Sequence, residues 1–166
     1  DVIGQGTEGN KDGSFDVAQF RFPQGLAKQE NILYVADQGN NYIRKVDLLK
    51  RKVETLVSAD NQALFSFDGV NRESVNAPWG LAVDKNHLYI SMAGANQIDV
   101  FDLKQKKLTL LAGGGGSHEK DGPSRQSFFS QPSGLALKGD ILYVTDSQLS
   151  AIREIEFGSK GDVRTD

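Results

Sequence analysis

The sequence predicts an all-β fold made of repeated four-stranded sheets, and one recurring motif carries most of that prediction. Pro-x-Gly-Leu-Ala occurs three times, at 23–27, 78–82 and 132–136, with 55 and then 54 residues from proline to proline. Each copy is followed at fixed distances by a tyrosine and an isoleucine: Tyr34, Tyr89 and Tyr143; Ile43, Ile98 and Ile152. A constant period of this size indicates a repeat architecture.

Each copy reads as four short strands bounded by turn residues. In the first copy, short apolar or alternating runs at 25–27, 32–36, 42–48 and 53–57 are separated by polar clusters, as is typical of strands and turns. No helical periodicity interrupts them. The third copy predicts its fourth strand at 162–165.

Four-stranded sheets repeated around an axis are the blades of a β-propeller. We therefore expect three blades, at approximately 22–57, 77–112 and 131–166, with 1–21 forming the end of a preceding blade and its connecting loop. Each blade buries its faces against two neighbours, so three blades leave an open face at either end. Either a second copy completes the ring as a homodimer, or further blades lie on a longer polypeptide.

The amino-acid sequence of the repeats resembles a known blade family. The stretches 76–79, 92–98, 131–136 and 146–153 are similar to NHL repeats, and in particular to the propeller of the thioredoxin-like/NHL-repeat proteins. That resemblance implies a six-bladed ring, of which three blades are half, preceded by a thioredoxin-like domain. The chain contains no cysteine, so the resemblance passes no redox role to any of its residues.

The composition excludes several classes of function. The chain has 166 residues, a net charge of −3 and no cysteine, which rules out disulfide scaffolds, thiol catalysis and cysteine-based zinc sites within it. No apolar run is long enough for a membrane span, so no membrane partner is expected. Because nonspecific nucleic-acid binding needs a basic face, the net charge of −3 counts against a nucleic-acid partner.

Motifs for metals and cofactors are incomplete. Glu8, Asn10 and Asp12-Gly13 resemble the start of a calcium loop, but its last ligand position holds a glutamine. The glycine-rich stretch 113–120 has a lysine but no helix pattern after it, so an inter-blade loop is favoured over a phosphate loop. His87 and His118 stand in different loops without a fixed carboxylate partner. We therefore predict no catalytic residue, no metal and no cofactor.

The strongest candidate binding residues directly precede the innermost strands. Gln24, Trp79 and Ser133 occupy the variable position of the three motifs, which in a propeller lies near the mouth of the central channel. Trp79 is the only tryptophan, and an exposed indole there would be a natural binding anchor. Packing of Trp79 between two blades is the alternative.

Charged residues recur on the second and third strands. Arg44 and Arg153 occupy matching positions, where the second copy has Asp99, and they either ring the channel or form paired structural charges. Asp37 and Asp146 end the second strand, where an aspartate can accept hydrogen bonds from the turn. We include Arg44 and Arg153 among the candidate binding residues.

These observations favour a non-enzymatic platform that presents its loops around a channel to a protein or a small-molecule ligand. One alternative is a propeller hydrolase or lyase with a metal in the channel. That class needs converging carboxylate or imidazole ligands, whereas the inner positions carry an amide, an indole and a hydroxyl. The other alternative is RNA binding by the propeller face, as in some NHL proteins, and the net charge counts against it.

Overall fold

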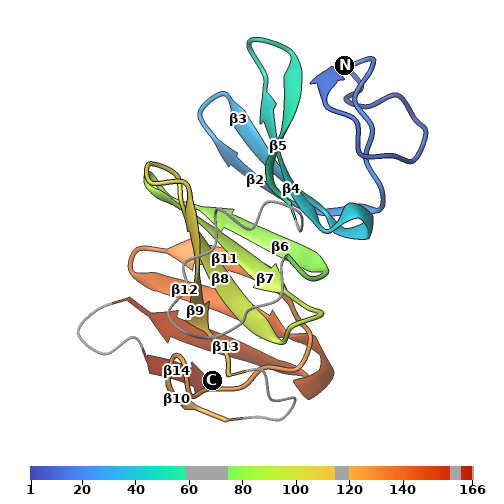
Figure 1. Cartoon of the computed structure of the whole chain (residues 1–166). Coiled ribbons are helices and arrows are strands. Elements are labelled where there is room, and N and C mark those ends of the chain that lie inside the picture. The colour runs from blue at the N-terminus through green and yellow to red at the C-terminus, as the bar shows by residue number, and fades with distance from the viewer. Residues whose placement is uncertain (59–74, 115–119, 158–161, 166) are drawn as a thin grey trace.

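The computed structural model describes residues 1–58, 75–114, 120–157 and 162–165. These residues form three antiparallel sheets that stack face to face as consecutive blades (Figure 1). No α-helix occurs among them, and two short 3-10 helices, Gln38–Asn40 and Ser147–Leu149, follow the second strands of blades 1 and 3. The predicted all-β propeller architecture is confirmed.

The strands follow the repeat closely. Blade 1 contains β2 (Pro23–Gln29), β3 (Ile32–Asp37), β4 (Tyr42–Asp47) and β5 (Lys52–Ser58). Blade 2 contains β6 (Pro78–Val83), β7 (His87–Met92), β8 (Gln97–Asp102) and β9 (Lys107–Ala112). Blade 3 contains β11 (Pro132–Lys138), β12 (Ile141–Asp146), β13 (Ala151–Glu156) and β14 (Asp162–Thr165).

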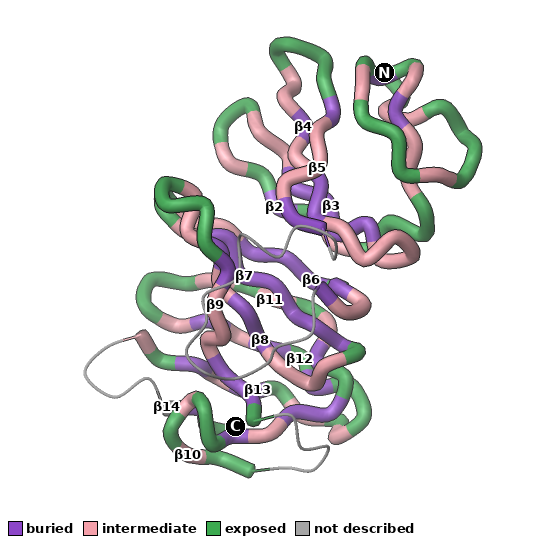
Figure 2. The backbone as a smooth tube through the Cα atoms, viewed as in Figure 1, coloured by how far each residue is buried: buried purple, intermediate pink, exposed green. Residues whose placement is uncertain are grey.

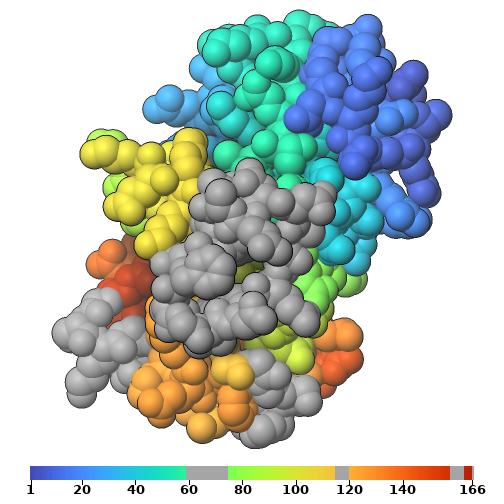
Figure 3. Space-filling model, viewed as in Figure 1, coloured from blue at the N-terminus to red at the C-terminus, as the bar shows by residue number. Residues whose placement is uncertain are grey.

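Two blades carry a fifth, two-residue strand. β1 (Gly13–Ser14) pairs with β5 of blade 1, and β10 (Gly122–Pro123) pairs with β14 of blade 3. Residues 13–14 of the N-terminal segment therefore complete the outer edge of blade 1, against which the segment packs (Figure 3). The Asp-Gly pair that opens each of these strands lets the backbone turn, since Gly13 and Gly122 have positive φ. The corresponding pair at 68–69 lies outside the described residues.

The core consists of layers between blades, and its burial is highest in the middle blade (Figure 2). The layer between blades 1 and 2 includes Tyr34, Ile43, Leu81 and Phe101. The layer between blades 2 and 3 includes Tyr89, Ile98, Phe129 and Ile155. A third cluster, with Phe15, Ala18, Val35, Val46 and Val53, fixes the N-terminal segment on the other face of blade 1. The recurring tyrosine and isoleucine thus pack each blade against the next.

Candidate functional site

The innermost strands β2, β6 and β11 stack side by side, one from each blade. A β-carbon on Gly25 would overlap the carbonyl oxygen of Trp79, and one on Gly80 would overlap that of Ser133. Only glycine lets the neighbouring backbones approach so closely. Gly25 and Gly80 therefore set the spacing between the inner strands at this end of the column.

The three residues that the sequence placed at the channel mouth do form one row. We call Gln24, Trp79 and Ser133 the mouth row. Adjacent members lie on adjacent inner strands, and the pairing of each inner strand with its neighbour shifts register at this point, between Pro23 and Leu26 in blade 1. Gln24 is exposed, Ser133 is half-buried, and Trp79 remains 42% exposed although its neighbours Pro78 and Gly80 are buried. Trp79 is therefore accessible from solvent.

Hydroxyl groups hold the backbone of the mouth row. The buried Ser91 hydroxyl accepts a hydrogen bond from Gly80 N–H (2.7 Å) and donates to the carbonyl of Ser133 in the next blade (2.6 Å). In blade 3, Thr145 Oγ1 accepts from Gly134 N–H (2.6 Å) and lies 2.8 Å from the Ser133 hydroxyl. These hydroxyls were not singled out from the sequence, because serine and threonine at a strand position carry no distinctive pattern.

Arg44 lies buried inside blade 1. Its side chain is fully buried and donates from Nη1 to Asp37 Oδ2 (2.9 Å) and from Nη2 to Asp12 Oδ1 (2.7 Å). The same guanidinium donates to the carbonyls of Gln19 and Lys11 and lies 5.0 Å from the ring centre of Phe20. Its charge is satisfied by groups of its own blade and the N-terminal segment, so this structure gives it no ligand-facing position.

Arg153 has the same environment in blade 3. It is fully buried and donates to Asp146 Oδ2 (3.2 Å) and Asp121 Oδ1 (2.6 Å). Its other two bonds go to the carbonyls of Phe128 and Lys120. The suggestion that Arg44 and Arg153 ring the channel does not fit this placement, because a buried charge needs paired carboxylates and carbonyls rather than water. Of the two sequence interpretations, the paired structural charge fits, with the pairing inside each blade.

The same network explains the recurring aspartates. Asp37 and Asp146 also accept a backbone N–H each, from Arg21 and Ser130 (both 2.7 Å). Asp121 accepts from the backbone N–H and the hydroxyl of Thr165 (3.1 and 2.9 Å), as Asp12 does from Thr55. Burial raises the pKa of Asp121, but its bonds to Thr165 and Arg153 outweigh this and leave the pKa below its usual value. The calcium-like loop is thus an anchor for an arginine, since Asp12 is already engaged.

A second polar cluster lies at the other end of β6. The Tyr89 hydroxyl donates a hydrogen bond to Asp84 Oδ2 (2.8 Å). The other carboxylate oxygen, Asp84 Oδ1, accepts the backbone N–H groups of Asn86 and His87. Burial and the Asp84 carboxylate raise the pKa of Tyr89 above its usual value. His87 Nδ1 lies 3.4 Å from Asp84 Oδ1, so His87 does have a carboxylate neighbour that the sequence did not reveal. His118 lies outside the described residues.

Metal and membrane signatures are lacking in the part of the chain that the structure describes. No group of three or more histidine, cysteine, aspartate or glutamate side chains there is arranged to hold a metal ion. No helix among the described residues is long and apolar enough to cross a membrane.

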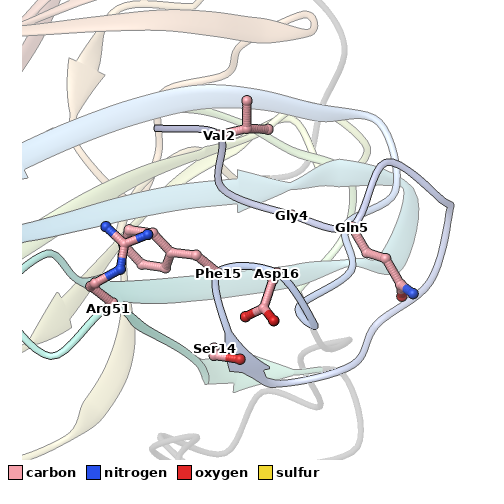
Figure 4. A pocket seen from close by; sticks show the side chains of 7 residues that line it. All are labelled: Val2, Gly4, Gln5, Ser14, Phe15, Asp16 and Arg51. Carbon is pink, nitrogen blue, oxygen red and sulfur yellow. The ribbon is translucent and has the colours of Figure 1, made fainter.

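A hollow of about 380 Å³ lies beneath the N-terminal segment (Figure 4). Its lining residues are Val2, Gly4, Gln5, Ser14, Phe15, Asp16 and Arg51. Arg51 already pairs with Asp1 and stacks over the Phe15 ring at 4.8 Å, so its charge is used in holding the segment to blade 1. The hollow is therefore a by-product of that attachment rather than a prepared binding site.

Comparison with known proteins agrees with the repeat and the blades. No family model matches the chain. It is 34% identical over 179 residues to human NHL repeat-containing protein 2, covering 92% of the chain. The chain is an NHL-repeat β-propeller segment. It is also 33% identical over 165 residues to SUPPRESSOR OF QUENCHING 1, chloroplastic, from Arabidopsis thaliana, covering 94% of the chain.

The NHL segment spans only part of these relatives: 25% of the human protein and 16% of the Arabidopsis protein. Among solved structures, an auxiliary nutrient binding protein from Bacteroides ovatus superposes with a TM-score of 0.66 over 89% of the chain and 36% of its own, at 16% identity. A gluconolactonase from Xanthomonas campestris superposes with a TM-score of 0.63 over 89% of the chain and 48% of its own, at 15% identity. At such identities the likeness shows the fold alone.

Proposed function

We propose that this NHL segment is a non-enzymatic binding platform whose mouth row receives a peptide segment of a protein partner. The observation that carries the proposal is Trp79, a large indole that stays 42% exposed on an otherwise buried stretch of β6. Tryptophan is among the residues that contribute most binding energy in protein interfaces. The entropy that Trp79 loses on binding is small, because the neighbouring inner strands already fix its backbone.

The chemistry of the row suits a peptide. The indole offers an apolar face, while the amide of Gln24 on one side and the hydroxyl of Ser133 on the other can both donate and accept hydrogen bonds. The Ser133 hydroxyl is already oriented by Thr145 and by Ser147, whose Oγ lies 2.6 Å away. A peptide can place an apolar side chain against the Trp79 indole. Its backbone amides on either side of that side chain would then meet Gln24 and Ser133.

Titratable groups lie elsewhere, which favours binding over catalysis. The Asp84, His87 and Tyr89 cluster stands at the opposite end of β6 from Trp79, and each buried arginine is already engaged by two carboxylates. A hydrolase or lyase would need such groups at the mouth row to activate water or to hold a metal. The mouth row carries none of the side chains that do this.

The experiment uses the single tryptophan as its own reporter. A random peptide library is selected against the chain, and a selected peptide is titrated while the emission of Trp79 is followed. We expect saturable quenching or a blue shift, with binding weakened at least tenfold in Trp79→Ala when measured by calorimetry. Leu49→Ala is the matched control, since Leu49 is 75% exposed in a turn remote from the row. Selected peptides that bind Trp79→Ala equally well, or a response to single-stranded RNA but to no peptide, would contradict the proposal.

A further inference from the structure

A cluster of exposed lysines lies at the end of blade 2 that is opposite to the mouth row. The turn between β8 and β9 carries Lys104, Lys106 and Lys107, and the turn between β6 and β7 carries Lys85. We call these four residues the lysine patch. Within the part of the chain that the structure describes, none of the four forms an ion pair. Blade 2 has a blade of this chain on either side, so both of its neighbours are already in place.

Hydrogen bonds hold the two turns side by side. Leu103 N–H donates to the carbonyl of Asn86 (2.8 Å), which joins the β8–β9 turn to the β6–β7 turn (Figure 1). Asp102 Oδ1 accepts the backbone N–H of Lys104 (2.8 Å), and the Asp102 carbonyl accepts that of Lys106 (2.8 Å). The backbone that carries the lysines is therefore ordered before a partner arrives, and such preorganisation lowers the entropic cost of binding.

The equivalent turn of blade 1 has its positive charge neutralised. There, between β4 and β5, Lys52 pairs with Glu54 on the same strand (2.7 Å). In blade 2 the residue equivalent to Lys52 is Lys107, but Thr109 replaces the glutamate. Blade 2 thus keeps the lysine of the repeat without its counter-ion, so the turn itself does not account for the unpaired charge.

The carboxylates nearest to the patch are engaged by their own turns. Asp84 accepts the backbone N–H groups of Asn86 and His87, and Asp102 accepts those of Lys104 and Gln105. Both aspartates are half-buried. The exposed residues of the two turns are the four lysines and the amides Asn86 and Gln105, so their outer surface presents positive charge and hydrogen-bonding amides.

We propose that the lysine patch binds an acidic segment, rich in aspartate or glutamate, of a protein partner. The ammonium groups attract a run of carboxylates, and the two amides can bond to its backbone. Nucleic acid fits less well, because the exposed residues of the two turns include neither an arginine for bidentate phosphate contacts nor an aromatic ring for base stacking. A lipid surface fits less well, because Leu103 packs against the core instead of offering an apolar side chain for insertion.

Fluorescence anisotropy with a fluorescein-labelled oligoglutamate peptide tests the patch. We expect saturable binding at low ionic strength that weakens as salt is added. The double variant Lys104→Gln with Lys107→Gln should raise the dissociation constant by at least about tenfold. The matched control is Lys50→Gln with Lys52→Gln, which changes the net charge equally on the equivalent turn of blade 1. It should raise the dissociation constant by less than about twofold, because these two lysines already pair with Asp47 and Glu54.

Other polyanions distinguish the partner class. An oligouridylate and vesicles of phosphatidylserine are titrated against the same proteins. Tighter binding of either one than of the oligoglutamate would overturn the proposal in favour of nucleic acid or lipid. The absence of saturable oligoglutamate binding, or equal losses in the two double variants, would also overturn it. Circular dichroism checks that both double variants keep the β-sheet spectrum, as expected because all of the replaced side chains are exposed.

Discussion

Arg153 in blade 3 repeats the position and partners of Arg44 in blade 1. Each fully buried guanidinium joins a strand-end aspartate, a loop aspartate and two backbone carbonyls, and each packs against a phenylalanine ring at about 5 Å, Phe20 or Phe129. Both partner sets combine residues of the blade with residues of the segment before it. In blades 1 and 3 the arginine therefore fastens the connecting segment to the blade that follows.

Removal of this arginine should be strongly destabilising. Arg153→Met leaves the buried Asp146 without its counter-ion, and breaking a buried pair in this way costs about 3–5 kcal/mol. Urea denaturation followed by circular dichroism measures the change in unfolding free energy. Arg164→Met is the control, because the Arg164–Glu156 pair is exposed and such pairs contribute about 0–1 kcal/mol. Equal losses for the two variants would refute a structural role for the Arg153 network.

A methyl group on Gly80 should separate blades 2 and 3. Its β-carbon would overlap the carbonyl oxygen of Ser133, a backbone atom that cannot rotate away, so Gly80→Ala should cost about 1–3 kcal/mol. Gly134→Ala is the matched variant at the same motif position, where the nearest atom is Thr145 Oγ1 at 3.0 Å. Measured by urea denaturation at a dilution where the chain is monomeric, it should lose much less stability than Gly80→Ala.

The bond between Tyr89 and Asp84 should show in alkaline solution. Because the pKa of Tyr89 is raised in the folded chain, its stabilising effect is complete below the usual tyrosine pKa of 10.0 and disappears as the pH rises through the folded value. Tyr89→Phe keeps the stacking on Phe157 and should cost about 1–2 kcal/mol near neutral pH. Ultraviolet titration of the folded chain at 295 nm should lose its latest-ionising tyrosine in this variant. Tyr34 is the equivalent tyrosine of blade 1, where Gln29 replaces Asp84. Tyr34→Phe should therefore lower the free energy of unfolding by less than Tyr89→Phe does.

Acid should weaken the turn that Asp102 holds between β8 and β9. The backbone N–H groups of Gln105 and Lys104 donate to its carboxylate and hold its pKa below the usual value of 3.8. A depressed pKa contributes stability that is present above 3.8 and lost as the pH falls through the folded value. Asp102→Asn keeps an acceptor but cannot titrate, so its urea midpoint should fall less between pH 7 and about pH 2 than that of the wild type. Parallel curves for the two proteins would contradict this assignment.

The periodic positions were predictable and the partners across loops were not. Tyr34 and Ile43 recur at fixed offsets, and a strand that repeats must bury the same face each time, so the blades followed from spacing alone. The pairing of Arg44 with Asp12 joins residues 32 positions apart through a loop whose path no local pattern encodes. The Asp-Gly pair before each blade was visible, but its role as the start of an added strand depends on where the loop returns. Trp79 was expected just before an innermost strand and instead lies within β6, and its exposure depended on packing that the sequence does not encode locally.

The two-residue strands β1 and β10 place the boundary of the folding unit ahead of the sequence motif. A unit that begins at Pro132 lacks its own outer edge and the aspartate for its arginine, whereas one that begins at Gly113 contains both. Gene duplication or deletion that cuts between Ala112 and Gly113 would therefore move a self-sufficient module. A cut at Pro132 would instead separate Asp121 from Arg153, which would keep only Asp146 as its carboxylate partner.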